Sequence, residues 1–405
     1  MKILFLSELF YPHGGGAELA TYLYAKLMSR SGNKIVVITN RFADEQGSSS
    51  DEGFTVYRLP LFRTTESVKY SVLLRIDALL SPFMRKMMKW ADVVYVPRFW
   101  FSAILLAKQC RVPVVTHFHD YIPICPLANY FDVLKKVNCT KKSPVCPMNC
   151  IYAYEKTGER GTASLIGSAF LNSVFGPNLQ RILALSDAII CVSKAQAKII
   201  ADARRDLSSK LNVVYNPLPE ARLDVDGCDF GYFGGFNYIK GFHVLLSSLF
   251  HLTETTRRKL HVHATKFEGL DLHLRDRFGR LGVQTYGKLN STDYSAVRRR
   301  VRTVIVPSVW EEPLPYVVTE ALQTERIVIA SRIGGIPEQA DGCKGAFLFD
   351  PGDHDQLAEK LSFIVNAETD DLIELGINNR EFVSKKFNND RILVDFQKVI
   401  IEVTD

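Results

Sequence analysis

The sequence has no uninterrupted apolar stretch near the roughly 18 residues that a membrane-spanning helix needs. It also lacks a repeat of solenoid length and a low-complexity tract. The first ten residues, MKILFLSELF, run directly into Tyr-Pro-His-Gly-Gly-Gly without the small-residue cleavage site of a signal peptide. We therefore expect a globular protein that begins with a β-strand. Its expected location is the cytoplasm, or the inner face of the cell membrane as a peripheral protein.

A strong net charge is absent as well, because the 405 residues carry only +6. The distribution is uneven: up to Leu218 there are 27 Lys and Arg against 16 Asp and Glu, and beyond it 23 against 28. A basic first half favours an anionic partner, such as phospholipid headgroups, a lipid phosphate or nucleic acid. The alternative is that the charges only keep two lobes soluble.

Residues 81–90, SPFMRKMMKW, combine apolar and basic side chains at helical spacing. This pattern fits a helix that lies in a membrane interface. It fits an ordinary helix that faces the protein core equally well.

Short apolar, β-branched runs alternate with helix-length segments along the chain. In the first half they lie at residues 2–7, 34–39, 54–59, 92–96, 112–118, 187–193 and 211–216, and in the second half at residues 229–236, 259–265, 283–287, 302–308, 326–331 and 345–349. Such runs suit strands covered on both faces, and the intervening segments complete βαβ units. The pattern predicts an α/β fold with two Rossmann-like, doubly wound domains facing across a cleft.

Changes in composition mark the expected domain boundaries. The Pro-, Asp- and Gly-containing segment at 217–228 predicts a linker between an N-terminal domain at 1–216 and a C-terminal domain at 229–385. Within the first domain, about residues 120–160 form a Cys-, Pro- and Lys-rich stretch without a clear period. A long irregular stretch in a compact domain usually serves a function or is mobile. Residues 386–405 are expected to form a helix that packs back on the first domain.

A glycine cluster follows the first strand of each predicted domain. Gly15 and Gly16 open a helix in the first domain, and Gly234 and Gly235 precede Lys240 in the second. Glycine lets backbone approach a ligand closely, a helix N-terminus attracts anions, and a lysine there adds a point charge for a phosphate. The first of these loops lacks the spacing of the dinucleotide fingerprint and of the nucleoside-triphosphate loop. A plain turn and a solvated lysine are therefore the alternatives.

Two glutamates flank a proline-rich loop in the stretch WEEPLPYVVTEAL. Glu312 lies in the loop, and Glu320 lies in the first turn of a helix predicted to begin at Tyr316. The strand at 302–308 places both acids near the carboxyl ends of the strands, where ligands bind in open α/β sheets. Glu320 can accept two hydrogen bonds from a ribose diol. The alternatives are a dipole-stabilising glutamate at 320 and a surface charge at 312.

The stretch THFHDYIP ends the fifth strand with two histidines, His117 and His119. A His-x-His pair binds metals in some proteins, but further ligands at metal-site spacing are absent nearby, apart from the cysteines. A hydrogen-bonding or polarising His119 at the strand end is the preferred interpretation. A purely structural histidine is the alternative.

Four of the eight cysteines lie in the irregular stretch, namely Cys125, Cys139, Cys146 and Cys150. They are candidate ligands for a tetrahedral structural zinc ion, although the paired C-x2-C spacing is absent. Two disulfides and four free thiols are the alternatives. The other four cysteines sit singly in or beside apolar segments and read as small core residues.

Together these motifs resemble glycosyltransferase family 4, the retaining enzymes with the GT-B fold. The resemblance covers nearly the whole chain and rests on motifs in the family's order. Its specific part is the Glu312-x7-Glu320 pair together with Lys240-Gly241; the other motifs are Gly15-Gly16-Ala17-Glu18, His119-Asp120, CVSKA at 191–195, VVYNP at 213–217, VPS at 306–308 and GGIPE at 334–338.

The resemblance implies an acceptor-binding first domain and a second domain that binds a nucleoside-diphosphate sugar. Glu320 would bind the ribose, Glu312 the donor sugar, Lys240 the diphosphate, and His119 the transferred sugar. The remaining implied donor contacts are Gly15, Gly16, Gly234, Gly235, Tyr316 and Val317. The resemblance implies catalysis without a metal or other cofactor. The implied partners are a glycan or lipid-linked acceptor and an anionic membrane surface, and not nucleic acid.

This sequence departs from the family pattern at two places. Gly235 stands where the family usually has Arg, which leaves one diphosphate cation unless Lys266 or another residue replaces it. Leu314-Pro315 replaces the usual Phe-Gly, and Pro315 has no N–H to donate, although Tyr316 and Val317 remain.

The sequence predicts a retaining glycosyltransferase that acts on a lipid-linked or cell-surface glycan precursor at the membrane surface. An epimerase or hydrolase of nucleotide sugars on the same fold is one alternative, and a non-catalytic nucleotide-sugar-binding protein is another. The sequence does not specify the donor sugar and base, the acceptor, the linkage or the oligomeric state.

Overall fold

The computed structural model describes residues 1–42, 45–61, 80–98, 100–125, 127–140, 150, 152–153 and 178–404. The chain divides into two compact units. Unit 1 consists of Met1–Pro217 and Asn389–Asp405, and unit 2 is the continuous segment Leu218–Asn388.

Unit 1 is built on an eight-stranded sheet with the order β10-β9-β6-β5-β1-β2-β4-β3. All neighbouring strands are parallel except β3 and β4. The strands are β1 Lys2–Leu6, β2 Lys34–Asn40, β3 Ser48–Asp51, β4 Phe54–Leu59, β5 Val93–Val96, β6 Val114–Phe118, β9 Ala188–Cys191 and β10 Leu211–Val213. The central strands β1, β5, β6 and β9 are buried along most of their length, which explains their unbroken apolar sequence.

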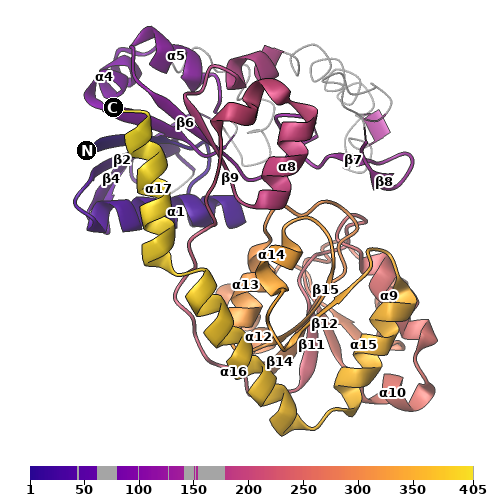
Figure 1. The fold of residues 1–405 in the computed structure, drawn as a ribbon. Coiled ribbons are helices and arrows are strands. Elements are labelled where there is room, and N and C mark those ends of the chain that lie inside the picture. The colour runs from indigo at the N-terminus through magenta and orange to yellow at the C-terminus, as the bar shows by residue number, and fades with distance from the viewer. Residues whose placement is uncertain are drawn as a thin grey trace. The chain divides into compact units, whose positions relative to one another are not determined.

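The helices of unit 1 include one from the far end of the chain. They are α1 Gly16–Arg30, α4 Pro82–Trp90, α5 Ala103–Gln109, α8 Lys194–Ala203, the 3-10 helix η1 Arg205–Lys210 and α17 Asn389–Glu402. Helix α17 packs against α1 (Figure 1). Its Phe396 ring stacks on Tyr24 with centroids 4.3 Å apart and meets Tyr95 edge-on at 5.2 Å. The last helix therefore contributes to the core of unit 1.

Unit 2 contains a six-stranded, fully parallel sheet with the order β13-β12-β11-β14-β15-β16. Its strands are β11 Asp229–Tyr232, β12 Val262–Ala264, β13 Val283–Thr285, β14 Val301–Val306, β15 Ile327–Ser331 and β16 Ala346–Phe349. Its helices are α9 Phe242–His251, α10 Glu254–Lys259, α11 Leu272–Gly279, α12 Ser291–Arg300, α13 Tyr316–Gln323, α14 Ile336–Ala340, α15 His354–Asn366 and α16 Thr369–Lys386. The predicted pair of doubly wound α/β sheets is confirmed.

The irregular stretch at about residues 120–160 contains a small two-stranded sheet. Strands β7 Phe131–Asp132 and β8 Val137–Asn138 pair in antiparallel fashion. Much of the remainder, including residues 141–149 and 154–177, lies outside the described residues.

The helix predicted at residues 81–90 is confirmed as α4, with the Ser81 hydroxyl accepting from the Met84 N–H at its start. Its apolar side chains Met84, Met87 and Met88 are buried, whereas Arg85 and Lys86 are exposed. The apolar face thus packs into unit 1, which supports the core-facing alternative over a helix inserted in a membrane interface.

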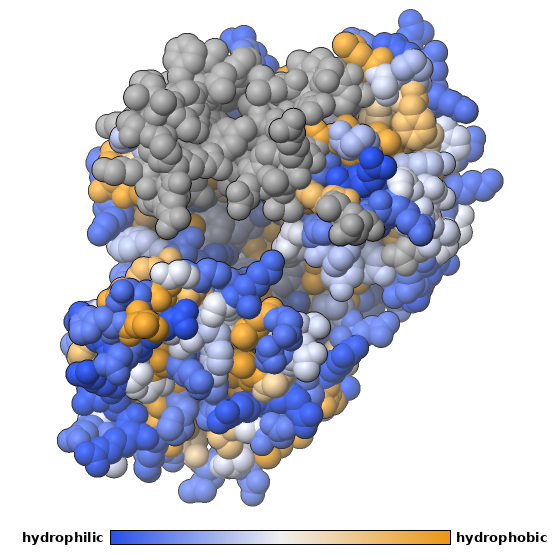
Figure 2. Space-filling view, turned by 180° about the vertical axis from the view of Figure 1, so that it is seen from behind, coloured by the Kyte–Doolittle hydropathy of each residue, from blue (hydrophilic) through white to orange (hydrophobic). Residues whose placement is uncertain are grey.

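Among the described residues, no helix has both the length and the apolar character needed to cross a bilayer. The large exposed apolar residues of unit 2 include Phe236, Phe250, Leu272 and Phe363. On the face that Figure 2 shows, apolar side chains of unit 2, in the lower part of the view, form separate small patches among polar ones. Exposed apolar residues scattered in this way are normal for a globular surface.

Candidate functional site

The strand order of unit 2 places a topological switch point between β11 and β14. Strand β11 is followed by β12 on one side, and β14 is followed by β15 on the other. At such a point the loops that leave the carboxyl ends of the two strands diverge and open a crevice where ligands bind. These are the loop at 233–241, with Lys240, and the loop at 307–315, with Glu312. The predicted donor residues of the second domain thus belong to one edge of one sheet.

Two glycines allow the loops at this edge to touch. Gly241 has φ +77°, and a Cβ there would lie 1.7 Å from the carbonyl oxygen of Pro307. Gly334 has φ +55°, and its Cβ would lie 2.1 Å from the carbonyl oxygen of Glu312. Only glycine fits such contacts, because a side chain would overlap the neighbouring backbone and strain its own. The loops after β11, β14 and β15 are therefore packed backbone to backbone.

Lys240 and Glu312 form the central ion pair of this edge. The Lys240 ammonium donates to Oε1 of Glu312 at 2.7 Å, and the Ser308 hydroxyl donates to the same oxygen at 2.7 Å. The Glu312 residue is only 3% exposed, and Lys240 Nζ also lies 5.0 Å from the centroid of the Trp310 ring. Burying a carboxylate is costly unless it is paired and hydrogen-bonded, and these partners meet that need. From the sequence, Ser308 was noted only within the VPS motif, and neither Ser308 nor Trp310 was given a role in the site.

Helix α13 begins at Tyr316, as predicted, with Pro315 at its N-cap. The carbonyl of Pro315 accepts from the Val318 N–H at 3.1 Å and from the Gln339 amide at 3.0 Å. Because Pro315 receives these two bonds, it fixes the direction of the helix start. Tyr316 and Val317 then occupy the first turn, where backbone N–H groups point away from the helix body and favour anions.

Glu320 lies in the second turn of α13, which corrects the expectation of a first-turn position. An explanation by the helix dipole is correspondingly weaker, because that effect falls off within the first turn. Burial raises the pKa of the Glu320 carboxyl, while the positive charges of Arg298, Arg326 and Lys266 act in the opposite direction. Within the described part of the chain, the Glu320 carboxylate makes no hydrogen bond. It is a mostly buried acid available to a ligand with hydroxyl donors.

Lys266 lies beside Gly235. Gly235 has φ +73°, and a Cβ there would lie 3.1 Å from the Lys266 carbonyl oxygen and 3.2 Å from its Cβ. Lys266 itself has a positive φ of 67° and an exposed side chain. The backbone at 235 is thus adapted to glycine, and a second cation stands next to it. The hydroxyl of Tyr232 donates to the Gly235 carbonyl at 2.9 Å and holds the loop in place.

In unit 1 the helix start after β1 already carries a carboxylate. Glu18, 1% exposed, accepts the Gly15 N–H at 2.6 Å, which is the half of a capping box in which the third helical residue bonds back to the N-cap backbone. The N–H of Gly15 is therefore engaged, and of the two predicted phosphate contacts only Gly16 is not committed in this way. The same Glu18 pairs with Arg98, whose Nε lies 3.4 Å from Oε1 of the fully buried Glu8.

This cluster sits at the switch point of the unit 1 sheet. Glu8 follows β1 and Arg98 follows β5, and these neighbouring strands lead to opposite sides of the sheet. The sequence analysis did not identify Glu8, Glu18 or Arg98 as a group. The one available signal was their position directly after strands 2–7 and 92–96 and after the Gly15-Gly16 pair.

His119 and His117 stack near the end of β6 with ring centroids 4.2 Å apart. Nδ1 of His117 lies 2.6 Å from the Tyr95 hydroxyl. Burial, with the nearby charge of Arg98, lowers the pKa of His119 to about 3. Its buried Nε2 makes no hydrogen bond within the described part of the chain. A permanently neutral imidazole can exchange hydrogen bonds with a ligand but cannot act as an acid near neutral pH.

The predicted zinc site is not supported. Cys146 lies outside the described residues, and the other three candidates, Cys125, Cys139 and Cys150, form no three-ligand cluster in the part that is described. Burial raises the pKa of the Cys125 thiol to about 11, which disfavours the thiolate that a metal would require. The Cys125 thiol instead lies 3.8 Å from Oδ1 of Asn129.

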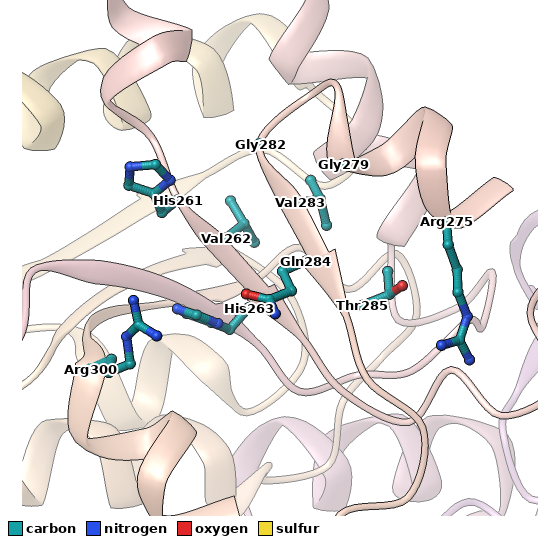
Figure 3. Close-up of a pocket in the computed structure, with 10 residues that line it drawn as sticks. All are labelled: His261, Val262, His263, Arg275, Gly279, Gly282, Val283, Gln284, Thr285 and Arg300. Carbon is teal, nitrogen blue, oxygen red and sulfur yellow. The ribbon is translucent and has the colours of Figure 1, made fainter. Parts of the chain in front are cut away.

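A separate cavity of about 360 Å³ opens in unit 2 beside β12 and β13 (Figure 3). In it His263 bridges the Tyr286 hydroxyl and the Asp229 carboxylate, at 2.8 Å each, and Arg300 lies 3.3 Å from the same carboxylate. His261, Gly282 and Arg300 precede strands β12, β13 and β14, at their amino ends. Ligands of open α/β sheets bind at the opposite ends of the strands, which is the edge that carries Lys240 and Glu312.

Two protein-family models match the chain, one over most of unit 1 and one over most of unit 2. A model described as Glycosyltransferase Family 4 matches residues 14–222, just over half of the chain. A second model, Glycosyl transferases group 1, matches residues 227–367. An uncharacterized glycosyltransferase of Methanocaldococcus jannaschii is 28% identical over 228 residues, which are 54% of this chain and 61% of that protein.

Solved structures share the fold at low identity. Sucrose-phosphate synthase from Thermosynechococcus elongatus is 16% identical, with a TM-score of 0.69 over 99% of this chain and 98% of that one. Anabaena HepE in complex with UDP-glucose is 17% identical, with a TM-score of 0.64 over 100% and 99% of the two chains. These likenesses establish the two-sheet architecture.

Proposed function

We propose that this chain, which belongs to glycosyltransferase family 4, uses its unit 2 crevice to hold a nucleoside-diphosphate sugar and transfers the sugar with retention to a hydroxyl group. The acceptor in this proposal is a glycan or lipid-linked glycan precursor. The observation that carries the proposal is the meeting of Lys240, Glu312, Glu320 and the α13 start at one sheet edge.

The charges at this edge fit the leaving group. In the proposed step the acceptor oxygen forms a bond to the anomeric carbon, the bond from that carbon to the diphosphate breaks, and the acceptor proton passes to a phosphate oxygen. Negative charge grows on the diphosphate as its bond breaks. Cations and N–H donors already in place there stabilise the transition state more than the ground state. Lys240 and the first-turn N–H groups at Tyr316 and Val317 are these donors in our proposal.

For Lys266 we propose the part of the second diphosphate cation. It stands beside Gly235, where the family resemblance leads one to expect an arginine, and its charge reaches Glu320. In this proposal the positive charge that the family usually carries at position 235 is supplied by Lys266 and is not lost. Gly234 and Gly235 allow the donor to approach the loop backbone.

The two carboxylates divide the donor in this proposal. Glu320, one turn inside α13, accepts hydrogen bonds from the ribose diol, and Glu312 faces the sugar while it remains bound to Ser308 and Lys240. In unit 1, we propose that His119 hydrogen-bonds a sugar hydroxyl as a neutral imidazole and that Gly16 offers an N–H to a phosphate. Assignment of the acceptor to unit 1 belongs to the same proposal.

Direct measurement of donor binding and transfer tests the proposal. Uridine-diphosphate sugars are the first to try, because HepE was solved with UDP-glucose. A bound donor should raise the unfolding midpoint of the full chain, because a ligand that binds only the native state stabilises it. Transfer to lipid-linked acceptors, followed by NMR of the new linkage, should show the anomeric configuration of the donor. Donor turnover that is independent of acceptor, or inversion of configuration, would contradict the proposal.

We further propose that the chain acts at an anionic membrane surface. This proposal rests on the basic first half of the chain. Flotation with anionic vesicles at about 0.1 M salt, where the Debye length is near 10 Å, tests it separately from catalysis. If the chain does not bind these vesicles, the proposed membrane association is wrong, but the transferase proposal is unaffected.

A further inference from the structure

Three metal-ligand side chains meet on unit 2 at the contact between α9 and α15. His251 is the last residue of α9, and His354 and Asp355 are the first two residues of α15. The two helices lie side by side (Figure 1). One ligand atom from each of the three residues lies within 4.8 Å of the other two. We propose that this cluster binds a divalent first-row transition-metal ion that ties the end of α9 to the start of α15.

The contacts within the cluster leave one imidazole nitrogen unsatisfied. Nδ1 of His251 lies 2.8 Å from Oδ1 of Asp355 and forms an ordinary ion pair or hydrogen bond with it. Nδ1 of His354 faces the same oxygen at 3.4 Å, is buried, and makes no hydrogen bond within the described part of the chain. A buried polar atom without a partner is costly, so it calls for a ligand. A short hydrogen bond to Asp355 accounts for His251, whereas His354 has only the longer 3.4 Å ion-pair contact to the same oxygen.

Two of the three ligand–ligand distances in the cluster are close to those between ligands of one metal ion, and the third, between the two histidines, lies within 4.8 Å. Ligand atoms at about 2.0–2.1 Å from a tetrahedral zinc ion lie about 3.3–3.4 Å apart, and neighbouring ligands of an octahedral ion lie about 2.9 Å apart. The two distances to Asp355 Oδ1, 2.8 and 3.4 Å, fall close to these values. The imidazole rings are 4.5 Å apart and inclined by 30°, so both can turn a nitrogen to one point.

The ligand set favours transition metals. Two imidazoles and one carboxylate suit Zn²⁺, Ni²⁺, Co²⁺ or Fe²⁺, whereas Mg²⁺ and Ca²⁺ prefer oxygen ligands only. The cluster borders a surface hollow of about 700 Å³ that Glu359 and Ser362 also line. Water can enter this hollow and complete the coordination sphere. Because the histidine and aspartate residues are partly exposed, the ion would exchange with solvent.

The site is distinct from the proposed donor crevice. Helix α9 begins at Phe242, directly after Lys240-Gly241, and its ten residues span about 15 Å before His251. A metal at the far end would therefore anchor the helix that follows the diphosphate lysine without contacting the donor. Its expected effect is on the stability of unit 2.

Equilibrium dialysis of the tag-free full chain with Zn²⁺ and Ni²⁺ tests the site. The wild type should bind one more ion per chain than His354→Ala or Asp355→Asn, and His273→Ala, on exposed α11, should match the wild type. Thiols contribute equally to all four proteins, so the difference isolates the cluster. Zn²⁺ should raise the unfolding midpoint of the wild type by more than that of the two cluster variants, and Mg²⁺ should have no such effect.

The cobalt spectrum provides a second measurement. The Co²⁺ absorption that disappears in Asp355→Asn should be of the nitrogen–oxygen type, without a sulfur-to-cobalt charge-transfer band. Equal stoichiometry and equal midpoint shifts in the wild type and both cluster variants would overturn the proposal. Folding of each variant, checked by circular dichroism without metal, keeps the comparison valid, and two different substitutions guard against the failure of one.

Discussion

The ammonium of Lys240 lies 2.7 Å from the carboxylate of Glu312, although 72 residues separate them in the sequence. The pair joins the loop after β11 to the loop after β14, on the two sides of the unit 2 switch point. A lysine held in this way is already oriented when a diphosphate arrives. The ammonium of Lys240 in turn compensates the charge of the buried Glu312 carboxylate. The catalytic role proposed for Lys240 and the stability of the crevice are therefore coupled.

Substitution of Lys240 should separate the two roles. Lys240→Met leaves the buried Glu312 carboxylate without its cation, and we expect a loss of about 1–3 kcal/mol in the free energy of unfolding. Adding Glu312→Gln should restore part of that stability, because the uncompensated charge is gone. Transfer activity should stay low in the double variant. Urea unfolding and initial rates measure the two effects, and a double variant no more stable than Lys240→Met would argue against the coupling.

Glu320→Gln should weaken donor binding by about 10- to 100-fold, since it replaces a charged acceptor of two ribose hydrogen bonds by a neutral amide with one acceptor oxygen. Titration calorimetry with a nucleoside-diphosphate sugar measures the change. Glu374→Gln, on the exposed surface of α16, is the matched control. The ribose assignment fails if both variants bind the donor as the wild type does.

Lys266→Met should raise the KM for the donor by about tenfold if Lys266 is the second diphosphate cation, since one exposed charge contact to a phosphate is worth about 1 kcal/mol or slightly more. The effect should shrink at high salt. Lys288→Met removes another exposed lysine of unit 2 and serves as the control. An unchanged KM at low salt would show that Lys266 is not the second diphosphate cation, and another residue would have to replace the missing arginine.

Gly241→Ala should destabilise the protein far more than Gly352→Ala. Both glycines have positive φ, 77° and 85°, so both substitutions carry a similar backbone strain of about 1 kcal/mol. Only at 241 would the new Cβ meet a backbone oxygen at 1.7 Å, whereas at 352 nothing lies within 4 Å. The midpoints of thermal unfolding give the comparison. Similar midpoints for the two variants would mean that the loops are not packed as described.

His119 should make stability depend on pH. Its pKa is lowered to about 3 in the folded protein, so between that value and the ordinary value near 6.5 the unfolded chain binds more protons. Its contribution to stability is thus present above about pH 6.5 and is lost progressively as the pH falls toward 3. His119→Gln should reduce this pH slope by at most about 1.4 kcal/mol per pH unit. Urea unfolding at several pH values tests it, with the exposed His261→Gln as the control.

Much of the fold follows from the local pattern of the sequence. Each of the thirteen predicted apolar runs overlaps one of the strands with a parallel neighbour, because a strand covered on both faces is largely apolar. The strands that were not predicted, β3, β7 and β8, are short or polar: β3 reads SSSD, and β7 and β8 have two residues each. Strand β3 pairs in antiparallel fashion with β4, and β7 with β8. Their own residues carry no apolar pattern that predicts these pairs.

The site could be predicted only where a motif is local. The start of α13 and the position of Glu312 follow from neighbouring residues, and so does Lys240-Gly241. The pairing of Glu18 with Arg98 joins residues 80 positions apart, and Ser308 acts through a side-chain bond that no spacing announces. The same reason explains the cysteines: closeness in the sequence did not bring Cys125, Cys139 and Cys150 together as a three-ligand cluster in the described part of the chain.

The return of the chain to unit 1 through α17 has a practical consequence for dissecting the protein. Unit 2 is one continuous segment, Leu218–Asn388, and can be cloned as a single piece. A fragment that stops at Pro217 would lack Phe396 and leave the rings of Tyr24 and Tyr95 without their cover. An expression plasmid for unit 1 should therefore splice the last helix back, through a short linker, onto the first 217 residues.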